Sequence, residues 1–141
     1  MTTVRENILA TIATKLASAP SIGAPVYRSR VAPLARGECP AVIVEPVADE
    51  ANQMVVPKLD WRMTVRVAIM VRSETPDQSA DALVEKVHSK MMSDLTLNGY
   101  AYDVQPVSTS WDLLETDIPT GLISYDFVIL YRTSLQDLTV V

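Results

Sequence analysis

Few residues in this chain are of the types that most often carry chemistry. His88 is the single histidine, so a histidine-rich metal site is excluded and a serine or cysteine triad has one possible base. No nucleophile-elbow pattern lies near any serine. Because His88 is spaced four residues from both Val84 and Met92, beside the apolar stripe of an expected helix, we interpret it as a residue at the boundary of the core.

The cysteine and the glycines offer no chemical motif either. Cys39 is the single cysteine, which excludes an intramolecular disulfide and a cysteine-cluster metal site. It has no neighbouring cation or helix start that would activate the thiol, so we interpret it as structural. With glycines at positions 23, 37, 99 and 121 alone, neither of the common phosphate-binding loops can be written. We expect no cofactor.

Carboxylates occur in two groups, both in predicted loops or strand ends. Solvated acidic residues are ordinary at such places, and metal binding or acid–base catalysis is the less favoured alternative. The chain is therefore expected not to be an enzyme. The two groups are Glu45, Asp49 and Glu50, and Asp112, Glu115 and Asp117.

Arginines gather on two predicted strands. Arg28 and Arg30 share one face of the first strand, as Arg62 and Arg66 do on a longer one. The net charge of -5 and the pI near 4.7 disfavour a sequence-reading nucleic-acid binder. Two interpretations remain: these arginines line a solvent-facing side of an antiparallel sheet, or they pair with acidic patches of a neighbouring copy.

The elements that position these side chains follow from hydrophobic periodicity. "KLDWRMTVRVAIMVR" alternates strictly, which predicts a strand with Trp61, Met63, Val65, Val67, Ile69 and Val71 on one face. Thr3 and Glu6 are placed as a capping box at a helix start. The expected elements are a helix at 4–17, strands at 26–31, 41–47 (where Pro46 marks the end or an edge) and 60–72, a helix capped by Thr75 with Pro76 at its first position, and strands at 102–109 and 122–133, with a long loop or hairpin tip at 48–58 and a loop at 112–121.

The second helix should bury one stripe of apolar side chains. Asn98 and Gly99 are expected to end what remains of it. The stripe is Ala80, Leu83, Val84, Val87, Met91 and Leu95.

This order predicts a single α+β domain over residues 1–141: a mainly antiparallel or mixed sheet of four to five strands, with two helices packed on one face. Strands 60–72 and 122–133 would extend ~43 Å and ~40 Å. A compact body of this size is only ~35 to 40 Å across. Since an isolated ribbon is marginal in water, strands that project beyond the body indicate an oligomer.

Two segments look unfinished in a single copy. Met54, Val55 and Val56 are apolar residues in the predicted loop or protruding hairpin at 48–58, and must fold back or meet a partner. The segment 134–141 ends apolar without a cap, so we expect a flexible end or a short strand that docks on a neighbour.

The whole layout resembles the bacteriophage tail terminator family, also called tail completion or minor tail protein U-like. The resemblance rests on the N-terminal helix, "VYRSRVAPLARGECPAVIV", the long tryptophan-bearing strand, the helix "TPDQSADALVEKVHSKMMSD" and the closing "YDFVILYRT". It spans nearly the whole chain, through diffuse motifs without a diagnostic residue.

The resemblance implies a structural protein of the virion, made in the host cytoplasm. It would form a homo-oligomer, a hexameric ring, on the head-proximal end of the tail. The ring would stop polymerisation of the tail tube protein, offer a surface for joining a head–tail connector or neck protein, and let DNA pass through its lumen without sequence-specific binding. Arg28, Arg30, Arg62 and Arg66 would then lie on the sheet face opposite the helices, and serve subunit or tube contacts together with Met54, Val55 and Val56.

Two other functions remain open. One is another neck or head–tail connector component, and the more distant one is a small-molecule-binding or enzymatic α+β domain. A membrane role is not expected, because no run approaches the ~18 apolar residues of a spanning helix. The N-terminal 20 residues lack the uninterrupted apolar region of a signal peptide.

Overall fold

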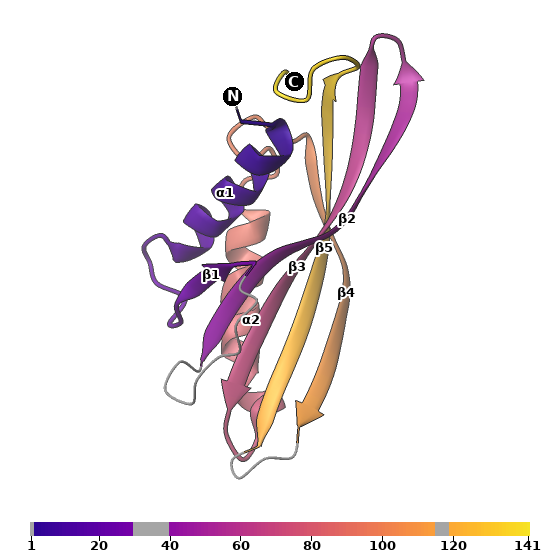
Figure 1. Cartoon of the computed structure of the whole chain (residues 1–141). Helices are drawn as coiled ribbons and strands as arrows, with labels where there is room; N and C mark the ends of the chain where they lie inside the picture. The colour runs from indigo at the N-terminus through magenta and orange to yellow at the C-terminus, as the bar shows by residue number, and fades with distance from the viewer. Residues whose placement is uncertain (1, 30–39, 115–118) are drawn as a thin grey trace.

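The computed structural model describes residues 2–29, 40–114 and 119–141 and has the predicted α+β architecture (Figure 1). Two helices and five strands follow the predicted order along the chain. The elements are α1 (Val4–Ala17), β1 (Val26–Arg28), β2 (Ala41–Val55), β3 (Lys58–Arg72), α2 (Pro76–Met92), β4 (Asp103–Leu114) and β5 (Thr120–Ser134).

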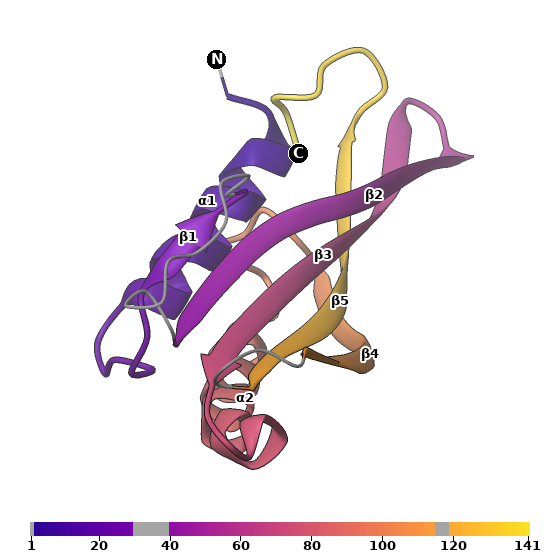
Figure 2. The same cartoon turned by 60° about the horizontal axis from the view of Figure 1, so that its bottom comes forward.

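The five strands form one mixed sheet in the order β1-β2-β3-β5-β4. β1 runs parallel to β2, and every other neighbouring pair is antiparallel. β3 and β5 stay in one uninterrupted register from the pair Lys58 and Ser134 to the pair Arg72 and Thr120. Both helices lie on the same face, with α1 over β1 and β2 and α2 over β3, β5 and β4 (Figures 1 and 2). The predicted fold class is confirmed.

The alternation in β3 is the basis of the core. Met63, Val65, Val67 and Ile69 are fully buried under the helices, as the period of two predicts, while Arg62 on the other face is exposed. From β5, Ile123, Phe127, Ile129 and Tyr131 join the same layer. α1 contributes Val4, Ile8, Ile12 and Leu16, and α2 contributes Ala80, Leu83, Val87 and Met91.

β2 is much longer than predicted, because Pro46 does not end it. The amide of Val42 and the carbonyl of Val44 both point toward β1 and its flanks. By the period of two, position 46 faces the same side, beyond the end of β1. Among the described residues no strand pairs with β2 there, so the missing N–H of proline interrupts no described strand pairing. A bulge follows between Pro46 and Ala48, and the strand continues to Val55. Residues 48–58 are therefore the far part of a β2–β3 hairpin.

β4 is also longer than predicted, and residues 112–114 belong to it instead of a loop. Trp111 pairs with Ile123, and Leu114 pairs with Thr120. β5 offers a partner along its full length, which the local composition of β4 does not reveal. Pro106 is tolerated because it lies on the edge strand beside a bulge.

Of the two predicted N-terminal caps, the one at Thr3 of α1 is confirmed and the one at Thr75 of α2 is not. The Oγ1 of Thr3 accepts a hydrogen bond from the Glu6 amide at 3.2 Å, as the capping box predicts. The Thr75 side chain makes no capping hydrogen bond at the start of α2. α2 ends at Met92 because Asp94 accepts from the amides of Thr96 and Asn98 and organises a turn.

The early end of α2 removes Leu95 from its buried stripe. Leu95 is 40% exposed, so the prediction that it belongs to the core was wrong. Lys90 in the last turn of α2 instead reaches the C-terminal end of α1, where its Nζ donates to the carbonyl of Ser18 at 2.6 Å. This bond satisfies a carbonyl at a helix end and joins the two helices.

The C-terminal segment is bound to its own chain. The amide of Val4, at the start of α1, donates to the carbonyl of Leu138 at 2.8 Å. The amide of Leu135 donates to the carbonyl of Pro57 at 2.7 Å, in the β2–β3 turn. Residues 135–141 therefore bridge the first helix and the hairpin, and both chain ends lie at the same end of the molecule (Figure 1).

Candidate functional site

The β2–β3 hairpin extends away from the part of the sheet that the helices cover (Figures 1 and 2). Val56 in its turn has 71% of its surface exposed. Met54 and Val55 lie at the end of β2, but their side chains are outside the description. Apolar surface at a projecting tip is typical of a contact with another chain.

The β4 edge is a second surface rich in exposed apolar side chains. β4 pairs with β5, and in the described part of the chain its other side carries no strand. Four side chains along it are about half exposed or more: Tyr102, Val107, Trp111 and Leu113. None of the four was predicted as a contact residue: Tyr102 and Val107 were expected in the strand at 102–109, and Leu113 in the loop at 112–121. The signal that could have found them is the apolar spacing of Val107, Trp111 and Leu113.

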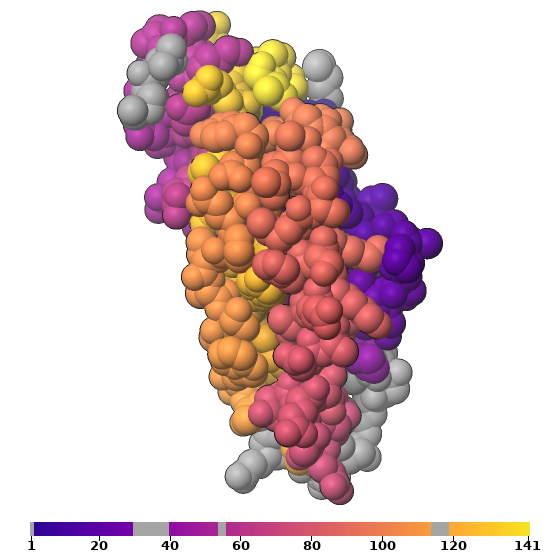
Figure 3. Space-filling model, turned by 180° about the vertical axis from the view of Figure 1, so that it is seen from behind, coloured from indigo at the N-terminus to yellow at the C-terminus, as the bar shows by residue number. Residues whose placement is uncertain are grey.

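Trp111 stands beside the beginning of α2. A hollow of about 400 Å³ is lined by Asp77, Gln78, Asp81 and Trp111. Figure 3 shows β4 and α2 side by side on this face of the molecule. The hollow combines an aromatic ring with two exposed carboxylates, a combination that suits a cationic side chain.

The sheet face opposite the helices is mostly polar. It contains a second hollow of about 260 Å³, lined by Ala48, Glu50, Arg62, Thr64, Val107 and Val128. Arg62 is exposed there and forms no ion pair with any described residue, although Glu50 lies directly opposite it on β2. Three of the four arginines predicted to make subunit contacts are described, and among these three only Arg62 has no ion pair with a described residue.

Arg66 and Arg28 have partners in their own chain. Arg66 binds Asp126 of β5 through two hydrogen bonds of 2.9 Å and 3.3 Å. Arg28 binds Glu6 of α1 through two of 2.5 Å and 3.0 Å, which lower the pKa of Glu6. Because Glu6 is on the helix side, Arg28 does not lie on the opposite face, and that part of the expectation was wrong. Arg30 lies outside the described residues.

The predicted acidic group Glu45, Asp49 and Glu50 is divided between the two faces of β2. Asp49 turns toward α1 after the bulge, and its Oδ2 accepts from Arg5 at 2.6 Å and from the hydroxyl of Tyr131. Arg5 also lies 5.2 Å from the ring centroid of Trp61. Burial and then the hydrogen bond to Asp49 raise the pKa of Tyr131. This ion-paired cluster, which the sequence did not suggest, attaches the first turn of α1 to the hairpin.

The second predicted acidic group, Asp112, Glu115 and Asp117, lies partly outside the description. Asp112 is exposed on β4, and residues 115–118, like Cys39, are not described. Within the described ranges, no three His, Cys, Asp or Glu side chains are grouped so that they could hold a metal ion.

His88 contacts one tyrosine. Its Nδ1 lies 2.6 Å from the hydroxyl of Tyr125, and the two rings stack at 6.0 Å. Tyr125 in turn stacks on the buried ring of Phe127 at 4.3 Å. Burial raises the pKa of Tyr125. His88 therefore sits at the edge of the core, in agreement with its interpretation from sequence, and covers an aromatic stack.

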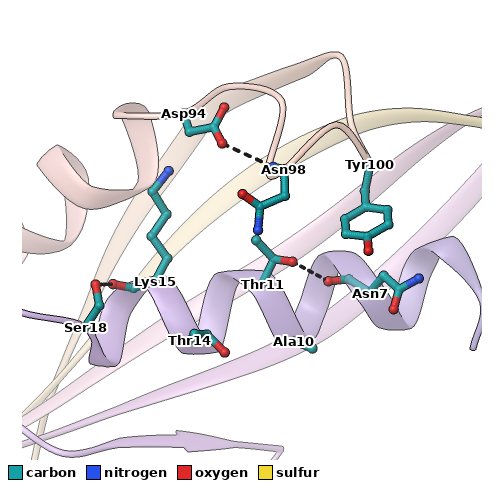
Figure 4. A pocket seen from close by; sticks show the side chains of 9 residues that line it. All are labelled: Asn7, Ala10, Thr11, Thr14, Lys15, Ser18, Asp94, Asn98 and Tyr100. Atoms are coloured by element: carbon teal, nitrogen blue, oxygen red, sulfur yellow. Dashed lines mark hydrogen bonds between the residues drawn. The ribbon is translucent and has the colours of Figure 1, made fainter.

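A groove of about 390 Å³ separates α1 from the turn after α2 (Figure 4). Asn7, Thr11 and Lys15 line it from α1, opposite Asp94 and Tyr100. Its polar groups are largely occupied within the chain. The Thr11 hydroxyl donates to the Asn7 carbonyl at 2.7 Å, and Asp94 receives the turn hydrogen bonds. The bond from the Thr96 hydroxyl, followed by those from the backbone, lowers the pKa of Asp94 to about 2.

No family model matches the chain, and no curated protein is significantly similar to it. Across the described residues, neither helix is long and apolar enough to cross a membrane.

Proposed function

We propose that the protein is a structural subunit of a phage virion that forms a ring on the head-proximal end of the tail tube. The ring ends polymerisation of the tube and provides the surface on which the head is joined. The observation that carries this proposal is the β2–β3 hairpin, which extends beyond the helix-covered part of the sheet with an exposed Val56 at its tip.

The hairpin supports a contact with another chain for an energetic reason. β3 is paired with β5 along the whole hairpin, but the tip leaves Val56 in water, and exposure of apolar surface costs free energy. In this chain β5 and the C-terminal segment support one side of the hairpin. Its other side, along β2 beyond Val44, has no neighbour in the described chain. A neighbouring subunit or the tube would supply one.

A ring also needs two different surfaces on each copy, because head-to-tail contacts join unlike patches and close after a fixed number of subunits. The hairpin belongs to β2 and β3, whereas the exposed apolar residues of β4 lie at the opposite edge of the sheet. Two distinct exposed surfaces therefore suit a closed ring better than a two-fold dimer, in which one patch meets itself.

The charge of the chain agrees with a conduit for DNA. A channel through which DNA must slide should not bind it tightly, and phosphate binding needs clustered lysine and arginine. The chain has a net charge of -5, and Arg28, Arg66 and Arg132 are neutralised by carboxylates of the same chain. We assign Arg62, which is exposed and has no ion pair with a described residue, to a subunit contact.

The experiment that tests this function is deletion of the gene from the virus that encodes it, with tail-tube lengths measured by electron microscopy. If the protein terminates the tube, the deletion should give overlong tubes of uneven length without heads. The wild-type gene supplied in trans should restore normal tube length and head joining. Tubes of normal length that lack heads would assign the protein to a neck or connector role. Normal infectious particles would exclude both roles.

A second measurement addresses the ring itself. A hexamer of this 15.5 kDa chain has a mass of about 93 kDa, well separated from the monomer. Native mass spectrometry of the purified protein, alone and with assembled tubes, would show whether a closed species forms and whether it needs the tube end.

A further inference from the structure

Charge is distributed unevenly along the chain. Residues 1–72 contain nine lysines and arginines and six aspartates and glutamates, whereas residues 73–141 contain three and eleven. No lysine or arginine occurs between Lys90 and Arg132. The first half is therefore cationic and the second half strongly anionic, within one domain.

The sheet order turns this asymmetry in sequence into an asymmetry in space. β1, β2 and β3 are adjacent, with α1 over the first two, and we call these four elements the basic flank. β5 and β4 follow on the other side. α2 packs against β3 as well as against β5 and β4, and we group it with β5 and β4 as the acidic flank. The elements of the basic flank contain seven lysines and arginines and five aspartates and glutamates, and those of the acidic flank contain three and six. The flanks thus have opposite net charge, which favours contact between unlike flanks of two copies over contact between like flanks.

The acidic flank has one place that combines charge with apolar surface. We call it the Trp111 surface: Asp77, Gln78, Asp81, Trp111 and Leu113. Trp111 is 60% exposed, and Leu113 lies beside it over Gly121, next to Pro76 at the start of α2. Neither Asp77 nor Asp81 forms an ion pair with a described residue. An exposed tryptophan rimmed by unpaired carboxylates is a typical anchor of a protein interface for a cationic partner.

The basic flank offers a matching group. Arg62 is exposed on the sheet face away from the helices, and its guanidinium is unpaired, in contrast to those of Arg5, Arg28 and Arg66. A guanidinium can stack on an indole ring while donating to carboxylates at the same time. Arg62 and the Trp111 surface belong to opposite flanks, so a contact between them would join two copies.

We propose that the Trp111 surface of one copy docks on the basic flank of a second copy, with Arg62 of that second copy between Trp111 and the carboxylates of Asp77 and Asp81. This inference rests on the proposed function in choosing a second copy as the occupant. It adds which surfaces meet and predicts that the contact is electrostatic.

The test is sedimentation velocity of the purified full chain and of charge variants across a concentration series. D81K and R62E should each weaken self-association by roughly tenfold, because each places like charges in the contact. The double variant D81K/R62E should regain most of the lost affinity, since the pair is then reversed. Raising the salt concentration from 0.05 M to 0.5 M should weaken the wild type in the same direction.

Matched controls separate docking from folding. E85K reverses the charge of an exposed residue of α2 outside the Trp111 surface and should change association little. W111A should weaken association, whereas L95A, which removes an exposed side chain outside the sheet, should not. Thermal unfolding of each variant at a concentration where it is monomeric should agree with the wild type within a few degrees.

The outcomes distinguish this inference from the proposed function. If the wild type associates but D81K, R62E and W111A associate equally well, the Trp111 surface is not the contact, while a ring through other surfaces stands. A wild type that stays monomeric at every concentration overturns this inference too, and tube termination is then judged by the tail-length measurement alone. Loss in both single variants without recovery in D81K/R62E overturns the pairing with Arg62.

Discussion

Arg66 and Asp126 face each other directly across β3 and β5 and are joined by two hydrogen bonds. Glu45 of β2 is the register partner of Arg66 on its other side, so the guanidinium lies between two carboxylates of its own chain. This arrangement fixes part of the polar face of the sheet internally, whereas Arg62, four residues earlier on the same face, is exposed and has no ion pair with a described residue.

A double-mutant cycle should measure the pair. Replacing Arg66 and Asp126 by alanine, singly and together, should give a coupling free energy of about 0.5–1 kcal/mol in urea unfolding, because the pair is partly exposed and screened. The matched cycle at Arg62 and Glu50, which are register partners without an ion pair, should give a coupling near zero. Equal coupling free energies in both cycles would contradict the conclusion that Arg66 is ion-paired within the chain and Arg62 is not.

Y131F should destabilise the fold by about 1–2 kcal/mol. It removes the hydroxyl that donates to the Oδ2 of Asp49, so that this oxygen keeps only its hydrogen bond from Arg5. Tyr131 is 1% exposed, whereas Tyr102 is 52% exposed, so Y102F is the control and should change the free energy of unfolding little. The free energy of unfolding of both variants is measured by chemical denaturation. A Y131F variant as stable as the wild type would show that the cluster of Arg5, Asp49 and Tyr131 does not stabilise the fold.

G121A should destabilise the protein although alanine suits a strand better than glycine. A methyl group at this position would stand 2.6 Å from the Cβ of Pro76, so the start of α2 must move away from β5. We expect a loss of about 1–3 kcal/mol. S124T, which adds a methyl on the opposite face of the same strand, serves as the control. A stabilised G121A would mean that α2 does not pack this closely.

Asp94 should make the protein more stable above pH 4 than below it. Its folded pKa of about 2 lies below the unfolded value of 3.8, so its contribution is present above pH 3.8 and is lost as the pH falls toward 2. Because the group is exposed, the contribution is roughly 1 kcal/mol after solvent screening.

The measurement is urea unfolding of the wild type and D94N at several pH values. The difference in free energy of unfolding between the wild type and D94N should be constant from pH 5 to 7 and should become smaller from pH 4 to pH 2. T96V removes the hydroxyl that donates to Asp94. The difference in free energy of unfolding between the wild type and T96V should also become smaller at low pH, by a lesser amount. A gap independent of pH would exclude a depressed pKa for Asp94.

Removing residues 135–141 should expose the beginning of α1. The amide of Val4 then loses its bond to the carbonyl of Leu138, and Pro57 loses the amide of Leu135. Hydrogen exchange should accelerate in the first turn of α1 and at the β2–β3 turn, while α2 stays protected. Unchanged protection at Val4 would show that the segment does not hold the helix.

Local pattern was sufficient for several elements. The four-residue spacing of α1, its Thr3 cap and the strict alternation of β3 depend on neighbours in sequence, and all three are confirmed. Expectations failed where the outcome depends on a distant strand. Pro46 stays within β2 because β1 has already ended beside it, and β4 reaches Leu114 because β5 is long enough to pair with it.

The same division holds for the candidate surfaces. The apolar tip at Val56 and the position of Arg62 on the polar face of β3 could be found from sequence, because an apolar residue in a polar stretch and an arginine on an alternating strand are local signals. That Arg62 is unpaired while Arg66 is not could only be seen in the structure. The Trp111 surface could not be found from sequence, since it is assembled from β4 and the start of α2, about 30 residues apart in the chain.

By itself, the sequence determined the fold class, the buried face of β3 and the charge imbalance between the two halves, because each depends on composition and period. The tertiary structure alone decided which arginines are paired within the chain and that the two halves occupy opposite flanks of one sheet. Strand order and ion pairs join residues that are distant in sequence, such as Arg66 and Asp126, and no local pattern encodes their contact.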